Sequence, residues 1–341
     1  MLDALSSLGH GIMTPLYYAV SAVMLAWHWI FTTIGLPEDS GWTWALSIIG
    51  LTVTIRALLI PLFVKQIKSS RNMQLLQPKI KELQKKYGHD RERMAQEQMK
   101  LFKDAGTNPF ASCLPLLLQM PVFFALFRLI DHAAVRQQAE GFLTTTQAVS
   151  IAEAQLLGVR IGDRFSGGGG VFELGDSTIN VKIITATLVV LMCITTFMTQ
   201  RQLMTKNMPA EAMSGQYAQQ QKLLLYVLPF VFAIGGVAFP VGVLLYWTTS
   251  NTWTMGQQFY VIRNNPAPGT PAFKAKQERD AKRGKTVAED PVEKAKAQAE
   301  AEKQAEEAKA LRQQPKKQTR NQRKKNAGGA RPGAQQRAKK K

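Results

Sequence analysis

The chain has 341 residues, 43 of them Lys or Arg and 24 Asp or Glu, which gives a formal net charge of +19. Together with a mean hydropathy of −0.12, these averages describe a soluble basic protein. The averages mislead, because residues 263–341 carry +14 whereas residues 1–262 carry +5 and nearly all the large apolar side chains. Several stretches of residues 1–262 are long enough to cross a bilayer, so a soluble single domain is excluded.

Residues 1–40 are predicted to form an external segment that contains one amphipathic helix. The sequence begins without a basic segment or a small-residue cleavage site, so no secretory signal is expected. Residues 12–34 are apolar enough to span, yet five polar side chains fall near one helical stripe: Thr14, Tyr17, Ser21, His28 and Thr32. Since no basic residue precedes them, we expect a helix lying in the outer interface. A sixth span is the alternative, and it would leave the orientation of every later segment unchanged.

Residues 41–262 are predicted to form an all-α membrane core. Five segments of this core are predicted spans, at about 42–64, 113–130, 181–198, 223–239 and 241–261. The loop at 65–110 carries 11 basic and five acidic residues, whereas residues 131–180 carry three and six. The positive-inside rule therefore places 65–110, 201–222 and the C-terminal tail in the cytoplasm, and the N-terminal segment and 131–180 outside.

The cytoplasmic loop at 65–110 is predicted to be a helical hairpin. Its arms are expected at about Gln66–Tyr87, with a bend at Pro78, and at Arg91–Asp104. An incomplete apolar stripe on these arms would leave Met-rich surface available to a partner. The alternative is a solvated basic hairpin that only fixes the topology.

The tail at 263–341 is predicted to be disordered or locally helical, because it holds too few large apolar side chains to form a core. An Ala-, Glu-, Lys- and Gln-rich stretch at 292–312 is the expected helical part. After Pro315 the chain carries 11 basic residues and no acidic one. This composition suits an anionic partner, either ribosomal RNA or acidic lipid headgroups.

Arg56 lies inside the first predicted span, nine residues before Lys65 and so about 14 Å from its cytoplasmic end. An arginine near the bilayer centre costs about 2.5–3.5 kcal/mol on insertion scales, and a carboxylate would normally offset this cost. The five predicted spans contain no Asp or Glu. Snorkelling is the alternative, but nine residues is a long reach for one side chain. The sequence therefore predicts that Arg56 faces a hydrated cavity.

Neutral polar side chains in three of the spans could line such a cavity. The candidates are Thr52, one turn before Arg56, Gln119 in the second span, and Tyr246, Trp247, Ser250 and Asn251 in the fifth. Taken singly, each is more often a hydrogen-bonding group between helices. Together with an arginine that lacks a carboxylate, they predict a hydrophilic groove in the membrane, open to the cytoplasm.

Catalysis has little support in the sequence. The four histidines are scattered, and no hydrolase, metalloprotease or nucleotide-binding motif occurs. The two cysteines, Cys113 and Cys193, each lie in an apolar run, which excludes a disulfide framework and a CxxC metal site. We therefore expect a protein that is not an enzyme and has no cofactor and no metal.

The stretch Gly41–Ile130 resembles the YidC/Oxa-type membrane protein insertases. The residues that carry the resemblance are SIIGLTVTIRALLIPLFVKQ, MQLLQPKIKELQKKYG and NPFASCLPLLLQMPVFFALF. The segment FPVGVLLYWTTSNTWTMGQQ, at Phe239–Gln258, is similar to the last span of that family. The resemblance covers residues 41–262 apart from the Gly-rich outer loop. The large periplasmic domain of some bacterial members and a lipobox cysteine are absent from this sequence.

The resemblance implies roles for individual residues. Arg56 matches the groove arginine of the family, Thr52 the threonine before it, and Gln119 a polar groove position. Tyr246 and Trp247 match an aromatic pair that contacts the incoming segment. The hairpin and the helix at 12–34 match a mobile cytoplasmic hairpin and an outer amphipathic helix.

The function that the resemblance implies is that of an insertase and membrane chaperone for nascent membrane proteins, multi-pass in the bacterial plasma membrane. The C-terminus is expected in the cytoplasm and the N-terminus outside. The expected partners are the ribosome, through the tail and the hairpin, anionic lipids and the Sec translocon, and a monomer is compatible with the sequence. A channel or transporter for a small anionic solute using Arg56 is the alternative, and a structural anchor that tethers ribosomes is a third. The sequence leaves open the substrate range, the dependence on Sec, the oligomeric state and the role of the outer loop.

Overall fold

The computed structural model describes residues 2–64, 66, 76–106, 114–167, 178–208 and 216–313. Most of these residues lie in helices, which confirms the predicted helical class at that level. The chain divides into two compact units, Met1–Asp290 and Pro291–Lys341. Three features named from the sequence lie outside the described residues: the predicted start of the hairpin at 67–75, Cys113, and the basic run after Pro315.

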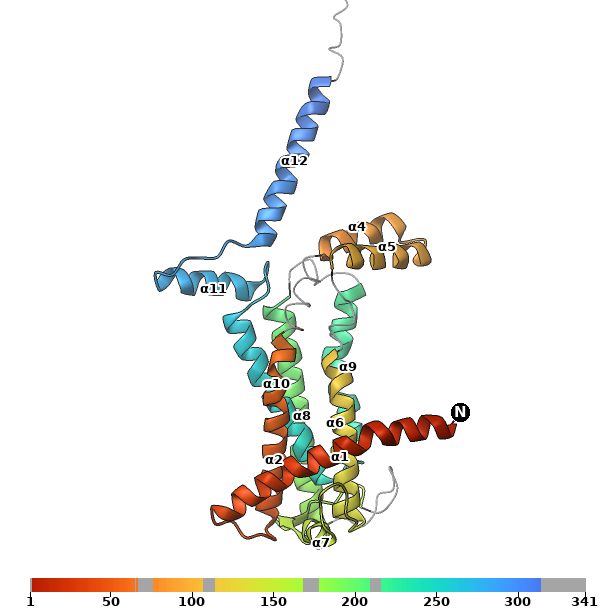
Figure 1. Cartoon of the computed structure of the whole chain (residues 1–341). Helices are drawn as coiled ribbons and strands as arrows, with labels where there is room; N and C mark the ends of the chain where they lie inside the picture. The colour runs from red at the N-terminus through yellow and green to blue at the C-terminus, as the bar shows by residue number, and fades with distance from the viewer. Residues whose placement is uncertain are drawn as a thin grey trace, which may run out of the picture. The chain divides into compact units, whose positions relative to one another are not determined.

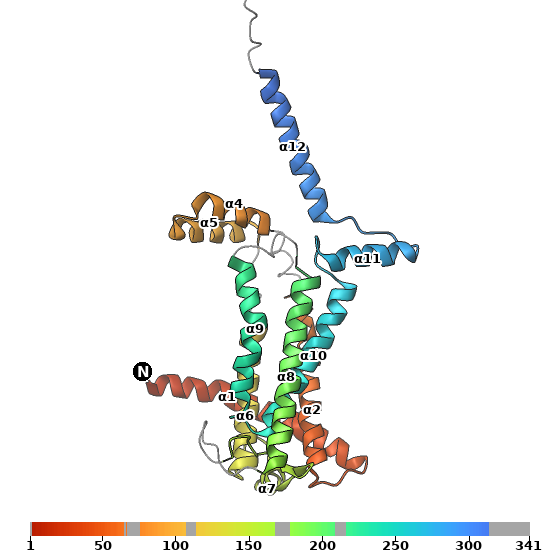
Figure 2. The same ribbon diagram turned by 180° about the vertical axis from the view of Figure 1, so that it is seen from behind.

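The first helix, α1 (Leu2–Thr33), crosses the bundle of long helices instead of running along it, as Figures 1 and 2 both show. It packs on α2 (Gly41–Leu58), where the indole nitrogen of Trp27 donates to Thr54 Oγ1 at 2.9 Å. The hydroxyl of Ser40 caps α2 by accepting a backbone hydrogen bond from its first turn. These contacts fix the start and the register of the helix that carries Arg56.

Four further long helices complete the bundle: α6 (Leu114–Ile130), α8 (Ile179–Lys206), α9 (Gln216–Gly236) and α10 (Val241–Asn264). α8 packs on both α9 and α10, and α10 packs on α2 and α6. Each of the five predicted spans overlaps one of the helices α2, α6, α8, α9 and α10 in the described part of the chain, although α2 ends at Leu58 and α9 at Gly236, before the predicted ends at 64 and 239. By length and composition alone, two of these helices, α2 and α8, are long and apolar enough to cross a membrane, and Gln221–Gly236 is a shorter apolar helix.

The loop between α6 and α8 is built from short elements. A π-helical turn, η2 (Asp131–Val135), continues α6 and is followed by α7 (Thr145–Glu153). Two short strands, β1 (Gln155–Leu156) and β2 (Val159–Arg160), then form an antiparallel hairpin in which Gln155 pairs with Arg160. The main apolar core lies where this loop meets α1, α2, α6 and α10, and Trp44, Leu51, Leu126 and Leu129 are fully buried in it.

The segment between α2 and α6 contains two helices in contact, α4 (Gln77–Tyr87) and α5 (Arg91–Asp104). Pro78 stands in the first turn of α4, where its missing N–H breaks no helical hydrogen bond. The predicted bend at Pro78 stays a prediction, because residues 67–75 of the same arm lie outside the described residues. The carboxylate of Asp90 caps α5 by accepting from the backbone nitrogen of Arg93 at 3.0 Å. α5 has no buried residue, and Met99 is 53% exposed.

The first part of the tail contains an ordered helix. α11 (Pro271–Lys282) packs against α8 and α10, and the side chain of Thr270 caps its start. The carboxylate of Asp290, which is buried, accepts a hydrogen bond from the backbone nitrogen of Gly269 at 2.8 Å. Of the two states predicted for the tail, disordered or locally helical, residues 271–282 adopt the helical one, and capping with a few buried contacts orders a segment that lacks large apolar side chains.

The second unit contains α12 (Pro291–Gln313). Its sequence is rich in Ala, Glu, Lys and Gln, which favour a helix even where little is buried. The stretch 292–312 that the sequence predicts to be helical lies within α12.

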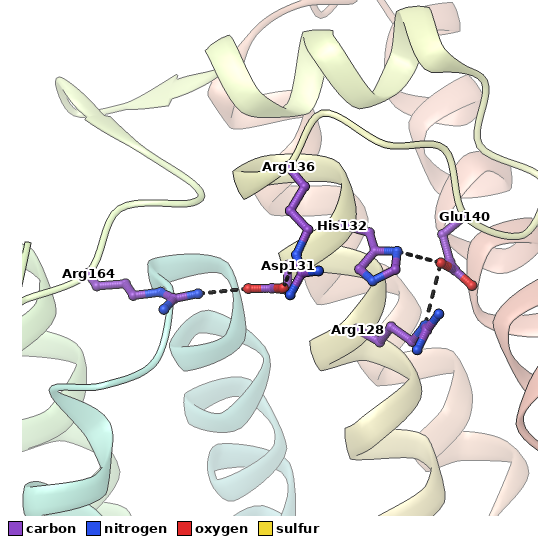
Figure 3. A network of polar contacts seen from close by, with 6 residues as sticks. All are labelled: Arg128, Asp131, His132, Arg136, Glu140 and Arg164. Atoms are coloured by element: carbon purple, nitrogen blue, oxygen red, sulfur yellow. Dashed lines mark hydrogen bonds and ion pairs between the residues drawn. The ribbon is translucent and has the colours of Figure 1, made fainter. Parts of the chain in front are cut away.

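A network of ion pairs joins the outer loop to the end of α6, as Figure 3 shows. Its members are Arg128, Asp131, His132, Arg136, Glu140 and Arg164. The buried carboxylate of Asp131 accepts from Arg136 Nε at 2.9 Å and from Arg164 Nη2 at 2.7 Å. Glu140 forms the second centre, with its carboxylate 2.7 Å from His132 Nδ1. The pair between Asp131 and Arg164 joins residues that lie 33 positions apart in the sequence.

Replacing Asp131 with asparagine is expected to lower the free energy of unfolding by about 1–3 kcal/mol, because two guanidinium groups then face a neutral amide. The change should appear as a lower Tm of the detergent-solubilised chain. Glu153→Gln, at an exposed carboxylate of α7, is the matched control and is expected to leave the Tm unchanged. An Asp131 variant as stable as the Glu153 variant would show that these pairs add no net stability.

Candidate functional site

A cavity of about 520 Å³ lies between α2, α6, α9 and α10. We call it the central cavity. It is lined by Arg56, Phe63, Gln66, Gln119, Met120, Phe123, Phe232, Phe239, Tyr246, Trp247, Ser250, Asn251, Thr254, Gln257, Gln258 and Val261. The cavity is partly open. One wall is aromatic and the other carries neutral polar groups around a single arginine.

Arg56 reaches the central cavity from the last turn of α2. Its Nε donates to the hydroxyl of Ser250 on α10 at 3.1 Å, and its Nη2 donates to the same oxygen. The guanidinium carbon also lies 5.8 Å from the ring centroid of Phe63. No Asp or Glu is among the described residues that line the central cavity. The positive charge is therefore held by a neutral hydroxyl and an aromatic ring, with no carboxylate to compensate it.

Two further hydrogen bonds join the helices around the central cavity. The amide of Gln119 on α6 donates to the phenolic oxygen of Tyr246 on α10. Asn251 Nδ2 on α10 donates to Thr196 Oγ1 on α8 at 3.2 Å. Gln119, Tyr246 and Asn251 thus help to hold the wall together, as neutral polar residues between apolar helices commonly do.

The apolar wall of the central cavity is an aromatic cluster around Trp247. Its ring centroid lies 4.9 Å from that of Phe232, 5.4 Å from Phe123 and 5.8 Å from Phe239. Trp247 and Phe123 are only partly buried and pack against the main core. The cluster therefore offers the central cavity an apolar surface.

Of the seven residues that the sequence nominates, six line the central cavity: Arg56, Gln119, Tyr246, Trp247, Ser250 and Asn251. Thr52 does not. Its side chain is 1% exposed, and its hydroxyl donates to the carbonyl of Ile48 at 2.7 Å. Although Thr52 lies one turn from Arg56, its short side chain is satisfied by its own helix, whereas the arginine is long enough to reach α10.

Ser250, one of the candidates in the fifth span, is the partner of Arg56. The structure also adds residues to the site that the sequence does not nominate. Thr254, Gln257 and Val261 extend the wall along α10 toward its end. The signal for them is that Ser250, Thr254, Gln257 and Val261 follow one another at steps of four, three and four residues, which places all of them on one helical face. Within the described residues, no group of three or more His, Cys, Asp or Glu side chains could hold a metal ion.

Comparison with known proteins places the whole of this site in one family. Residues 35–268 match the family model described as 60Kd inner membrane protein. The chain is also 34% identical over 286 residues to the membrane protein insertase YidC of Tropheryma whipplei (strain Twist), which covers 82% of this chain and 92% of that protein. The chain belongs to the YidC family. The matched range contains α2, α6, α8, α9 and α10, and hence every residue that lines the central cavity.

Two further YidC relatives and one solved structure are also similar to this chain. The insertase YidC of Streptomyces avermitilis is 45% identical over 279 residues, or 82% of this chain, and the match spans 64% of that longer protein. The YidC of Mycobacterium tuberculosis (strain H37Rv) is 36% identical over 263 residues, covering 72% of each chain. A solved structure titled "Active YidC insertase crystal structure with the first transmembrane domain resolved" is similar over 71% of this chain and 46% of that one, with 21% identity and a TM-score of 0.45.

Proposed function

We propose that this chain is a membrane protein insertase and chaperone that passes hydrophilic segments of nascent membrane proteins through the central cavity. The observation that carries the proposal is Arg56, a cation in an apolar bundle that lines a partly open cavity containing no carboxylate among its described residues. The names of the relatives support the same function, since they are called membrane protein insertases.

The proposed topology has α2, α6, α8, α9 and α10 as five spans, with the N-terminus outside and the C-terminus in the cytoplasm. Large apolar side chains on α8 and α9 support it, because they are exposed and would face lipid: Ile183 is 56%, Val190 55%, Phe230 71% and Ile234 64% exposed. The crosswise direction of α1 supports an interfacial helix rather than a sixth span (Figure 1). α6 has 17 residues, near the lower limit for a span, so the bilayer would be thin around it.

In the proposed mechanism, the central cavity shortens the hydrophobic path that a hydrophilic tail must cross. Arg56 would attract acidic residues of the tail and exchange the weak contact with Ser250 for a charge-assisted one. The aromatic cluster around Trp247 would meet the apolar segment that follows. That segment would then leave sideways into lipid, driven by burial of its apolar surface, so no nucleotide is needed at the site.

Reconstitution of the purified chain in liposomes tests this function. We expect insertion of a single-span protein with a short acidic outer tail, scored by protease protection, well above that in empty liposomes. Flux of small anions through the same liposomes should be negligible. Flux that depends on Arg56, without insertion, would favour the channel instead; family membership does not favour that alternative.

The proposed partners are nascent membrane proteins, the ribosome, anionic lipids and the Sec translocon. Because α11 packs in the first unit, the ribosome-binding part of the tail is best sought in the second. Deleting residues 291–341 is expected to weaken co-sedimentation with ribosomes about tenfold or more at low salt and much less at high salt, since the segment is strongly basic. Co-sedimentation that the deletion leaves unchanged would rule out this role of the tail.

A further inference from the structure

A second cavity, of about 190 Å³, lies between the ends of α8 and α10 and the side of α11. We call it the basic pocket. It is lined by Gln202, Lys206, Phe259, Ile262, Arg263, Ala272, Ala275 and Arg279. It shares no residue with the central cavity. In the proposed topology it lies at the cytoplasmic end of two spanning helices.

Three cations from three different helices converge on the basic pocket. Lys206 is in the last turn of α8, Arg263 in the last turn of α10, and Arg279 in the last turn of α11. None of the three forms an ion pair with a residue that the structure describes, and no carboxylate is among the described lining residues. Arg279 Nη2 donates instead to the backbone carbonyl of Arg263 at 2.5 Å, which holds α11 against the end of α10. The pocket is therefore a preformed site for an anion.

The remaining lining of the basic pocket suits a lipid. Ile262 and Ala272 are buried and form an apolar floor. Phe259, which also lines the pocket, is 52% exposed, as expected for an aromatic side chain at a membrane interface. Gln202 adds an amide oxygen that is buried without a hydrogen-bond partner in the described part of the chain. A ligand with hydroxyl groups beside its phosphate would satisfy this acceptor as well as the three cations.

We propose that the basic pocket binds the headgroup of an anionic phospholipid of the inner leaflet, with phosphatidylglycerol as the probe. Arginine and lysine side chains would hold its phosphate by charge-assisted hydrogen bonds, and the acyl chains would leave the pocket along Phe259. The small volume and the apolar floor favour one headgroup over RNA, whose phosphates form an extended track. The bound lipid would hold α11 at the membrane surface. The proposal rests on the proposed topology but not on the insertase activity.

Titration of phosphatidylglycerol into the delipidated full chain, followed by native mass spectrometry, tests the proposal. The triple variant Lys206→Gln/Arg263→Gln/Arg279→Gln is expected to bind the first phosphatidylglycerol at least about tenfold more weakly, given roughly 1 kcal/mol per basic residue near a membrane. The matched control, Lys285→Gln/Lys303→Gln/Lys309→Gln, removes the same charge from exposed positions and should bind like the unmodified chain. Phosphatidylcholine should bind weakly and equally to all three proteins.

Two milder variants test the same pocket if the triple variant is unstable. Lys206→Gln alone should weaken phosphatidylglycerol binding without loosening α11, and Arg263→Lys/Arg279→Lys should retain it. Equal binding by the triple and control variants would overturn the proposal. So would a triple variant that loses ribosome binding while it keeps the lipid.

Discussion

Replacing Arg56 with alanine is expected to reduce insertion of a single-span protein with an acidic outer tail at least tenfold in proteoliposomes. A pair of unit charges 4 Å apart is worth about 4 kcal/mol at an effective dielectric constant of 20 and about 1 kcal/mol in water. A tenfold change in insertion corresponds to about 1.4 kcal/mol, so even a partly hydrated ion pair between Arg56 and an acidic residue of the tail is strong enough to produce it. Arg56 can supply it because its partner in the structure, the hydroxyl of Ser250, is neutral, so a carboxylate would be a stronger acceptor for the guanidinium.

Three controls separate charge from folding. Arg56→Lys should keep most of the insertion, because a cation stays in the central cavity. Lys222→Ala, which removes an exposed cation from α9, should have no effect. A substrate whose outer tail carries no acidic residue should be insensitive to Arg56→Ala. Insertion of the acidic substrate by the alanine variant at the level of the unmodified chain would rule out the electrostatic role.

Replacing Gly41 with alanine is expected to destabilise the fold by about 1–3 kcal/mol, because α2 begins directly against the outer loop. A Cβ atom at Gly41 would lie 2.1 Å from the backbone oxygen of Gln155 in β1, a distance that no real contact reaches. Neither Gly41 nor Gln155 can move away easily, because the atoms that would clash belong to the backbone at the start of α2 and of β1. The expected result is a lower Tm of the detergent-solubilised chain.

Gly256→Ala is the matched control for this prediction, because a Cβ atom there would meet nothing within 4 Å. It lies in α10, where alanine is a better helix former than glycine by about 1 kcal/mol. The two substitutions are therefore expected to move the Tm in opposite directions. Equal shifts would show that the contact between Gly41 and β1 is not maintained in solution.

Local patterns made the helices predictable from the sequence. Apolar runs bounded by Pro, Gly and charged loops place α10 at Val241–Asn264, close to the predicted 241–261. The glycine and aspartate at 88–90 place α5 at its predicted bounds. The predicted polar residues of the fifth span share one face of α10, so their meeting at one cavity follows from helical periodicity.

Long-range pairings were not predictable, because nothing local encodes them. Arg56 and Ser250 are 194 positions apart, and Asp131 and Arg164 are 33 apart. Thr52 does not line the cavity, because its hydroxyl donates to a carbonyl of its own helix. Helical periodicity places Thr52 on the same face as Arg56, but it does not show which partner the hydroxyl takes. The order of α11 also escaped prediction, since it depends on capping by Thr270 and on contacts with α8 and α10.

Site-specific photo-cross-linking to a stalled nascent membrane protein tests the central cavity as the route of insertion most directly. A photoreactive residue at Gln119 or at Trp247 is expected to cross-link to the hydrophilic tail and the apolar segment of the nascent chain. The same residue at Val190, on the exposed face of α8, should give little product. Cross-links from Val190 that equal or exceed those from Gln119 and Trp247 would contradict the account.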